Sequence, residues 1–287
     1  MSKEKPASEY PFYDIPGPIA IVHRGGDAAG ADKENSMAAF ESANRAGIIY
    51  AETDTVATKD GVPLAFHGSR KEKIAKKTGL PLRDAIQAMT YKEVVEKVRV
   101  GGEPMPLLEE LLVTFPNMRF FIDPKTPEAV EPTAKIIERL HAQDRVSIGA
   151  FSYKRTGQTA ELIGGQKDVC TSLAALGSVA MLGLGNRATA PFVKPYFTRT
   201  EATSLQVPDV AVSSNMIERA HDLGIHVIVW PSSWKNPAAV SHENDTSEYM
   251  KRVMEQGVHG LMSDRTALMK DIILAHDPQN QSIRRDN

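Results

Sequence analysis

Short apolar runs alternate along this sequence with segments in which apolar residues recur every three or four positions. The runs are typical of buried strands, and the periodic segments are typical of helices that pack one face on a sheet. Nine runs have the character of strands: residues 19–23, 48–54, 63–67, 119–123, 146–151, 169–173, 203–207, 225–230 and 260–263. Helices are predicted at residues 36–47, 106–112, 133–143, 213–223 and 250–257. This alternation predicts an α/β fold of parallel strands joined by right-handed crossovers.

The chain length suits one large domain. Its 287 residues fit an α/β barrel, for which about 250 residues are typical, and they also fit two ordinary domains. A closed barrel uses eight strands, so one run is in excess, and we expect one of the last three to be short or outside the barrel. The predicted organisation is an arm at 1–18, one domain at 19–275 with a mostly helical insert at about 68–105 after the third strand, and a mobile polar tail at 276–287.

Composition narrows the possible functions. A net charge of −2 offers no basic excess for binding nucleic acid, and the single cysteine, Cys170, excludes an internal disulfide. The uncharged stretch 169–186 contains three glycines and several polar residues, so a buried strand followed by a helix is favoured over stable membrane insertion. No continuous apolar segment precedes Ile19, and a cytoplasmic protein is the default expectation. The oligomeric state is left open by these features.

Two carboxylates stand side by side at the end of the second run. Side chains alternate along a strand, so Glu52 and Asp54 point to the same face and repel each other unless a cation lies between them. Asp123 ends another run and adds a third oxygen ligand. Because the carboxyl ends of barrel strands converge at one mouth, these side chains predict a site for a divalent cation such as Mg²⁺ or Ca²⁺.

Cations and imidazoles occupy equivalent strand ends. Arg24 and Lys125 add positive charge that suits an anion such as phosphate. His23 and His67 carry imidazoles, whose ordinary pKa of about 6.5 suits proton transfer near neutrality. A metal site, two cationic side chains and two imidazoles together suit phosphodiester cleavage. In that reaction one histidine activates the attacking hydroxyl and the other protonates the leaving alkoxide.

The motifs that carry these residues resemble those of the glycerophosphodiester phosphodiesterases. They occur in the same order over most of the chain, from Ile19 to about Leu268: HRG at 23–25, EN at 34–35, ETD at 52–54, TKDG at 58–61, His67, PLLEELL at 106–112, IDPK at 122–125, FS at 151–152, VIVW at 227–230 and LMSDR at 261–265. The resemblance implies a (β/α)8 TIM barrel like that of phosphatidylinositol phospholipases. It also implies hydrolysis of glycerophosphodiesters to glycerol 3-phosphate and an alcohol, through a cyclic phosphate if the neighbouring glycerol hydroxyl attacks first.

The resemblance also implies roles for individual residues. His23 and His67 match the acid–base pair, Arg24 matches the phosphate contact, and Glu52 and Asp54 match metal ligands. The chain departs from the family pattern at three places. Gly68 stands where the family has aspartate, Asp123 stands where it has the longer glutamate, and Pro231-Ser232-Ser233 replaces Thr-Val-Asn after Trp230.

Several assignments keep an alternative. Trp230 either contacts the substrate or belongs to the core. Asp123 and Lys125 either belong to the site or pair with each other as an exposed ion pair. Glu34 is a weaker substrate-binding candidate that alternatively caps a helix or orients Arg24. Asp264 is left outside the predicted site.

Two rival functions also remain open. A lysophospholipase D would use the same groups on a substrate with an acyl chain, for which the uncharged stretch 169–186 is a candidate groove. A catalytically weak phosphodiester-binding protein is kept open by Gly68. The basic residues of the insert are either a lid that attracts anions or an ordinary solvated helix face: Arg70, Lys71, Lys73, Lys76 and Lys77.

Overall fold

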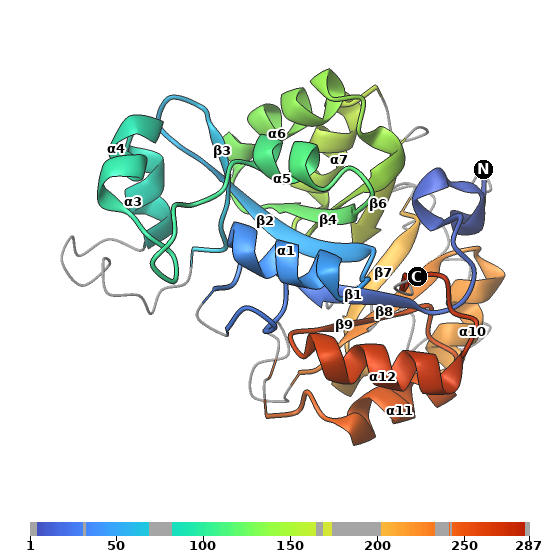
Figure 1. Cartoon of the computed structure of the whole chain (residues 1–287). Coiled ribbons are helices and arrows are strands. Elements are labelled where there is room, and N and C mark those ends of the chain that lie inside the picture. Colours follow the sequence, from blue (N-terminus) through green and yellow to red (C-terminus); the bar gives the residue numbers. More distant parts are fainter. Residues whose placement is uncertain are drawn as a thin grey trace.

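A closed barrel of eight parallel strands with helices on its outer face forms the body of the protein (Figure 1). The computed structural model describes residues 5–30, 33–68, 82–164, 169–173, 202–232, 241 and 243–284. The barrel strands are β1 (Ile19–His23), β2 (Tyr50–Ala57), β4 (Arg119–Pro124), β5 (Val146–Ala150), β6 (Cys170–Leu173), β7 (Ser204–Pro208), β8 (His226–Trp230) and β9 (Gly260–Ser263). Strand β1 pairs with β9 on one side and with β2 on the other, and these two pairings close the barrel.

The excess strand is the third run of the sequence. Strand β3 (Pro63–Ala65) pairs antiparallel with the end of β2 and lies outside the barrel. A tight turn causes this reversal, since Thr58 Oγ1 donates to Asp60 Oδ1 at 2.6 Å and Gly61 takes a φ of +78°. The prediction that one of the last three runs is in excess was wrong, because β7, β8 and β9 all pair within the barrel.

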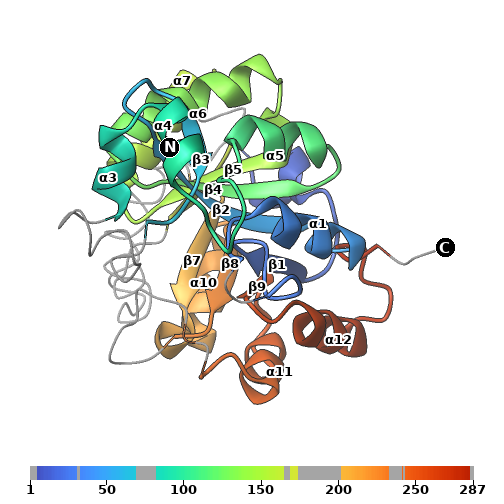
Figure 2. The same cartoon turned by 60° about the vertical axis from the view of Figure 1, so that its left-hand side comes forward.

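Helices between the strands pack their apolar faces on the outside of the barrel. They are α1 (Met37–Arg45), α5 (Leu108–Thr114), α6 (Pro127–Arg139), α7 (Tyr153–Leu162), α10 (Ser214–Asp222), α11 (Ser247–Glu255) and α12 (Thr266–His276). Helices α11 and α12 lie side by side, and α12 packs next to β1 and β9 (Figure 2). The helix predicted at 133–143 begins earlier, at Pro127, a residue type that suits the first turn of a helix.

The N-terminal arm closes the end of the barrel where the strands begin. Two short 3-10 turns, η1 (Ala7–Glu9) and η2 (Pro11–Tyr13), bury Phe12 and Tyr13 against the first interior layer. The Phe12 ring meets Tyr50 and Phe121 at centroid distances of 5.4 and 4.9 Å, and Tyr50 Oη donates to the Phe12 carbonyl at 2.8 Å. The arm is therefore part of the core and not an extended strand along the surface.

The described part of the polar tail, residues 276–284, is also fixed, whereas we expected a mobile tail. Ile283 is buried and bridges to Ile48, which gives the tail an apolar anchor. Asn280 Nδ2 donates to the Pro18 carbonyl at 2.8 Å, and Ala20 N donates to Ser282 Oγ at 3.2 Å. Short polar side chains thus satisfy main-chain groups at the start of β1.

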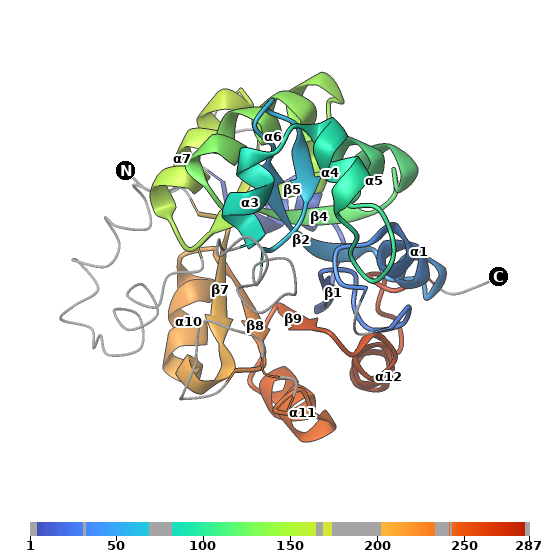
Figure 3. The same ribbon diagram turned by 90° about the vertical axis from the view of Figure 1, so that its left-hand side faces the viewer.

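The insert faces the viewer in Figure 3, on the end of the barrel where the strands finish. Its described part carries α3 (Leu82–Ala88) and α4 (Tyr91–Lys97), and Ile86 and Val94 pack there with Val56 and Leu64 of the β2–β3 hairpin. The basic residues at 70–77 and most of the uncharged stretch, 174–186, lie outside the described residues. Within the described residues no helix is long and apolar enough to span a membrane.

Candidate active site

The register of three neighbouring strands gathers the predicted groups at the carboxyl end of the barrel. Tyr50 belongs to the interior cluster, so Glu52 and Asp54, two and four residues later, also face inward. In the parallel pairings His23 lies opposite Glu52, and Asp54 lies opposite Asp123. The prediction that these strand ends share one mouth is confirmed by the pairing.

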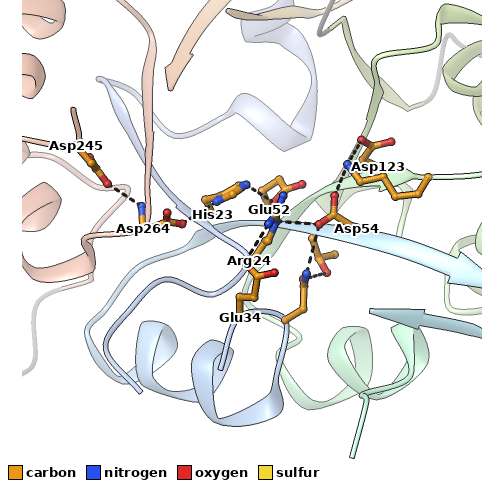
Figure 4. A network of polar contacts seen from close by, with 11 residues as sticks. His23, Arg24, Glu34, Glu52, Asp54, Asp123, Asp245 and Asp264 are labelled. Carbon is orange, nitrogen blue, oxygen red and sulfur yellow. Dashed lines mark hydrogen bonds and ion pairs between the residues drawn. The ribbon is translucent and has the colours of Figure 1, made fainter. Parts of the chain in front are cut away.

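Three carboxylates are buried at this mouth (Figure 4). The exposed fractions are 7% for Glu52, 0% for Asp54 and 8% for Asp123. The Lys125 ammonium lies 2.5 Å from Asp54 Oδ1 and 2.5 Å from Asp123 Oδ2, so the pair of Lys125 with Asp123 is buried and not exposed. Burial raises the pKa of Asp54, but the charges of Lys125 and Arg24 outweigh it and hold that pKa well below its ordinary value.

The charges of the other two carboxyl groups, those of Glu52 and Asp123, are less fully balanced by neighbouring cations. Burial and the neighbouring charge of Asp54 raise the pKa of Glu52 to about 7, and burial raises the pKa of Asp123 despite Lys125. Among the described residues Glu52 Oε2 and Asp123 Oδ1 are buried without a hydrogen-bond partner. Buried carboxylate oxygens without hydrogen bonds are costly, so a further positive charge would stabilise this part of the site.

A divalent cation would supply that charge. Glu52, Asp54 and Asp123 offer hard oxygen donors of the kind that Mg²⁺ and Ca²⁺ prefer. In the described part of the chain no three His, Cys, Asp or Glu side chains converge as a complete ligand set. Lys125 now holds the position between Asp54 and Asp123, and a bound cation would compete with its ammonium group there.

Arg24 is held by two carboxylates. Its backbone has a φ of +51°, its Nε lies 3.0 Å from Asp54 Oδ2, and its Nη1 donates to Glu34 Oε2 at 3.0 Å. Glu34 therefore orients Arg24, while Ser36 caps α1 by accepting a hydrogen bond from Ala39 N. Asn35, the second residue of the EN motif, donates to Asp54 Oδ2 at 3.3 Å.

His23 is oriented from behind by a carboxylate that we had left outside the site. Its Nδ1 lies 2.7 Å from Asp264 Oδ1, and its Nε2 lies 3.9 Å from Glu52 Oε2 (Figure 4). An ionised carboxylate only accepts hydrogen bonds, so Nδ1 carries the proton and Nε2 is left for proton transfer. Burial and Arg24 lower the pKa of His23, but Asp264 and Glu52 outweigh them and raise it above its ordinary value.

Asp264 is itself fixed in place. Its main-chain N donates to Asp245 Oδ2 at 3.1 Å, and Ser263 Oγ donates to the same carboxylate at 2.8 Å. Asp245 is fully buried. The sequence signal for Asp264 was its position directly after β9, where barrel enzymes place functional side chains.

His67 follows β3, and its pKa is shifted in the opposite direction to that of His23. Burial lowers the pKa of His67 to about 3, although the charge of Asp54 opposes this shift. His67 is therefore neutral at physiological pH, and its buried Nδ1 has no hydrogen-bond partner. Two imidazoles whose pKa values are pushed apart have the property that an acid–base pair requires.

The opposite wall of the mouth is aromatic. Trp230, at the end of β8, has an exposed fraction of 4% and packs with the interior cluster. Its ring meets Phe151 edge to face at a centroid distance of 6.2 Å, and Phe151 is exposed. Ser232, in the segment that departs from the family pattern, is fully buried, and its Oγ donates to Asp209 Oδ1 at 2.8 Å.

Comparison with known proteins agrees with this geometry. The model of the glycerophosphoryl diester phosphodiesterase family matches residues 23–268. The chain belongs to this family. Membership confirms the resemblance drawn from the motifs, and the chain is therefore an enzyme of the phosphodiesterase class.

Relatives of the family match over most of their length. The chain is 30% identical over 267 residues to "Probable glycerophosphodiester phosphodiesterase 2" of Mycobacterium tuberculosis, which covers 90% of this chain and 92% of the relative. A glycerophosphodiester phosphodiesterase from Parabacteroides distasonis has a TM-score of 0.68 at 17% identity, covering 90% of this chain and 98% of its own. An Oleispira antarctica phosphodiesterase in complex with the product sn-glycerol-3-phosphate has a TM-score of 0.67 at 15% identity, covering 92% and 98%. These two structures confirm the barrel fold.

Proposed function

We propose that this protein hydrolyses glycerophosphodiesters to sn-glycerol 3-phosphate and an alcohol, with a divalent cation held by Glu52, Asp54 and Asp123. The observation that carries the proposal is that, among the described residues, two buried carboxylate oxygens have no hydrogen-bond partner, Glu52 Oε2 and Asp123 Oδ1, at a mouth that also holds two imidazoles. A bound Mg²⁺ or Ca²⁺ would neutralise charge on the phosphoryl oxygens. The relatives support the substrate class, through the name of the mycobacterial protein and the product bound to the Oleispira enzyme.

The protein's own cations would bind the phosphate. Burial lowers the pKa values of Arg24 and Lys125, but the surrounding carboxylates outweigh burial and raise both, so the two groups stay charged. Arg24 presents a planar guanidinium that Glu34 orients, and Lys125 presents a single ammonium. We assign both to the phosphate, and we assign Trp230 and Glu34 to the edge of the substrate site.

The two histidines would move the protons. One imidazole removes the proton of the neighbouring glycerol hydroxyl, whose oxygen attacks phosphorus, while the other protonates the departing alkoxide. Water then opens the cyclic phosphate with the roles reversed, which restores both imidazoles. His23 is prepared for this exchange because Asp264 fixes the proton on Nδ1 and leaves Nε2 facing the mouth.

A substrate panel with a metal titration tests the proposal. Glycerophosphocholine, glycerophosphoethanolamine and lysophosphatidylcholine are each incubated with the protein, and glycerol 3-phosphate and free alcohol are measured. We expect turnover of the glycerophosphodiesters that a chelator abolishes and Mg²⁺ or Ca²⁺ restores. Turnover that survives the chelator contradicts the metal assignment, and no turnover with any metal leaves the phosphodiester-binding rival.

A lysophospholipase D is the second candidate. Phe151 is exposed next to Trp230 after the carboxyl end of β5, Tyr153 at the start of α7 is exposed as well, and such rings suit contact with an acyl chain. Faster turnover of lysophosphatidylcholine than of glycerophosphocholine, lost selectively in Phe151→Ala, favours this candidate. Equal loss on both substrates speaks against it.

A further inference from the structure

Gly68, the departure directly after His67, is explained by a side chain of the insert. Its φ is +73°, in the left-handed region that favours glycine. A Cβ added to Gly68 would lie 2.7 Å from Arg83 Cβ and 3.3 Å from Arg83 Cα. The space that a larger residue at position 68 would need is therefore filled by α3 of the insert.

Arg83 also bonds to the histidine that precedes this glycine. Arg83 Nη2 donates to the His67 carbonyl at 2.8 Å. On the other side, Phe66 N donates to the Asp54 carbonyl at 2.9 Å. The segment that carries the imidazole is thus anchored once to the barrel and once to the insert.

The second anchor matters because the ring has little else to fix it. Among the described residues the buried Nδ1 of His67 has no hydrogen-bond partner, so the orientation of the ring depends on the main chain that carries it. Glycine has more conformational freedom than any other residue, and Gly68 would loosen that main chain. A hydrogen bond from a charged guanidinium is among the stronger ones available, and it acts at the adjoining peptide group.

We propose that Arg83 is a positioning residue for the His67 imidazole, acting through the hydrogen bond that it donates to the His67 carbonyl. The inference rests on the proposed function, in which His67 transfers a proton. It makes the insert part of the catalytic machinery, because α3 supplies the residue that fixes the segment.

Three variants test the positioning role by kinetics on glycerophosphocholine with the activating metal. In Arg83→Ala we expect kcat to fall about tenfold with KM within twofold, and in Arg83→Lys we expect at least threefold recovery of kcat. The matched control is Arg99→Ala, at a residue just after the end of α4, where Arg99 Nη1 donates to the carbonyls of Val95 and Val98. Its kcat should equal that of the wild type. A rise in KM at constant kcat would show that Arg83 binds substrate, and an effect equal to that of Arg99→Ala would remove the proposal.

A second measurement does not depend on activity. Protein labelled with ¹⁵N-histidine is compared by NMR, with the His67 ring signals assigned from their loss in His67→Gln. Arg83→Ala should shift or broaden these signals and speed exchange of the His67 amide at least tenfold, and Arg99→Ala should not. Unchanged signals and exchange overturn the inference. If the wild type turns over no substrate, the proposed function fails, and this comparison still decides the role of Arg83.

Discussion

Removing the carboxylate behind His23 should lower activity and move its pH dependence. In Asp264→Asn the shape of the side chain is kept and its charge is lost, while Asp264→Ala also removes the acceptor 2.7 Å from His23 Nδ1. A hydrogen bond to a charged group contributes about 1.5–3 kcal/mol. Since about 1.4 kcal/mol corresponds to a tenfold change in rate, we expect kcat to fall roughly tenfold in Asp264→Asn and up to roughly a hundredfold in Asp264→Ala.

The sign of the pH effect follows from the pKa of His23. Asp264 is the largest of the influences that raise this pKa, and the Arg24 charge and burial both lower it. Without Asp264 the pKa falls, so the limb of the kcat–pH profile that His23 controls should move to lower pH. The ion pair of His23 with Asp264 also stabilises the fold at pH values below about 6.5, the pKa of histidine in the unfolded chain. That contribution is lost as pH rises through the raised pKa of His23 in the folded protein.

The assay is a kcat–pH profile with the activating metal, next to unfolding curves for each variant. Asp14→Asn is the matched control, because Asp14 Oδ1 pairs with Arg119 at 2.6 Å at the opposite end of the barrel. It should leave the profile unchanged. An Asp264→Asn enzyme with wild-type kcat and an unmoved limb would refute the role that we give to this carboxylate.

Three further predictions concern the metal, the core and pH. In Glu52→Ala the activity and its dependence on added cation should disappear together, and a chelator titration measures both. Metal affinity retained in calorimetry would show that another residue binds the cation. Phe12→Ala should lower the free energy of unfolding by about 3–5 kcal/mol because it removes a buried ring from the closed end of the barrel, whereas Val113→Ala, on an exposed side chain, should change it little in the same denaturant titrations. Burial and the neighbouring His221 lower the pKa of His259 to about 4, so the protein should lose up to about 3 kcal/mol of stability as pH falls from about 6.5 toward that value. Urea unfolding of His259→Gln should show a shallower loss over this range, and an identical slope would contradict the assignment.

The sequence predicted the site best where chemistry is local to one strand. Glu52 and Asp54 could be placed on one face from the alternation of side chains alone, and their apolar lead-in marked them as buried. The ion pair of Lys125 with Asp54 could not be predicted in this way. It depends on the position of β4 next to β2, and a neighbouring carboxylate on another strand is not visible in a single run of residues.

Other features of the structure could not be predicted from the sequence. Asp264 lies 241 residues from His23 and became a candidate only when β9 paired with β1. Helix α7 was missed because its buried face consists of Thr156, Thr159 and Ala160, which leave little apolar periodicity. The excess strand was assigned to the wrong place, because length and composition do not distinguish a hairpin strand from a barrel strand.

The pairing of β1 with β9 has a consequence for biosynthesis. Strand β1 is made long before β9, and the bonds of Ser282 and Asn280 to Ala20 and Pro18 form later still. Contacts between segments far apart in the sequence are slow to form, and the open sheet keeps unpaired edges until they do. During translation the barrel of this enzyme therefore stays open until the β9 segment has been made.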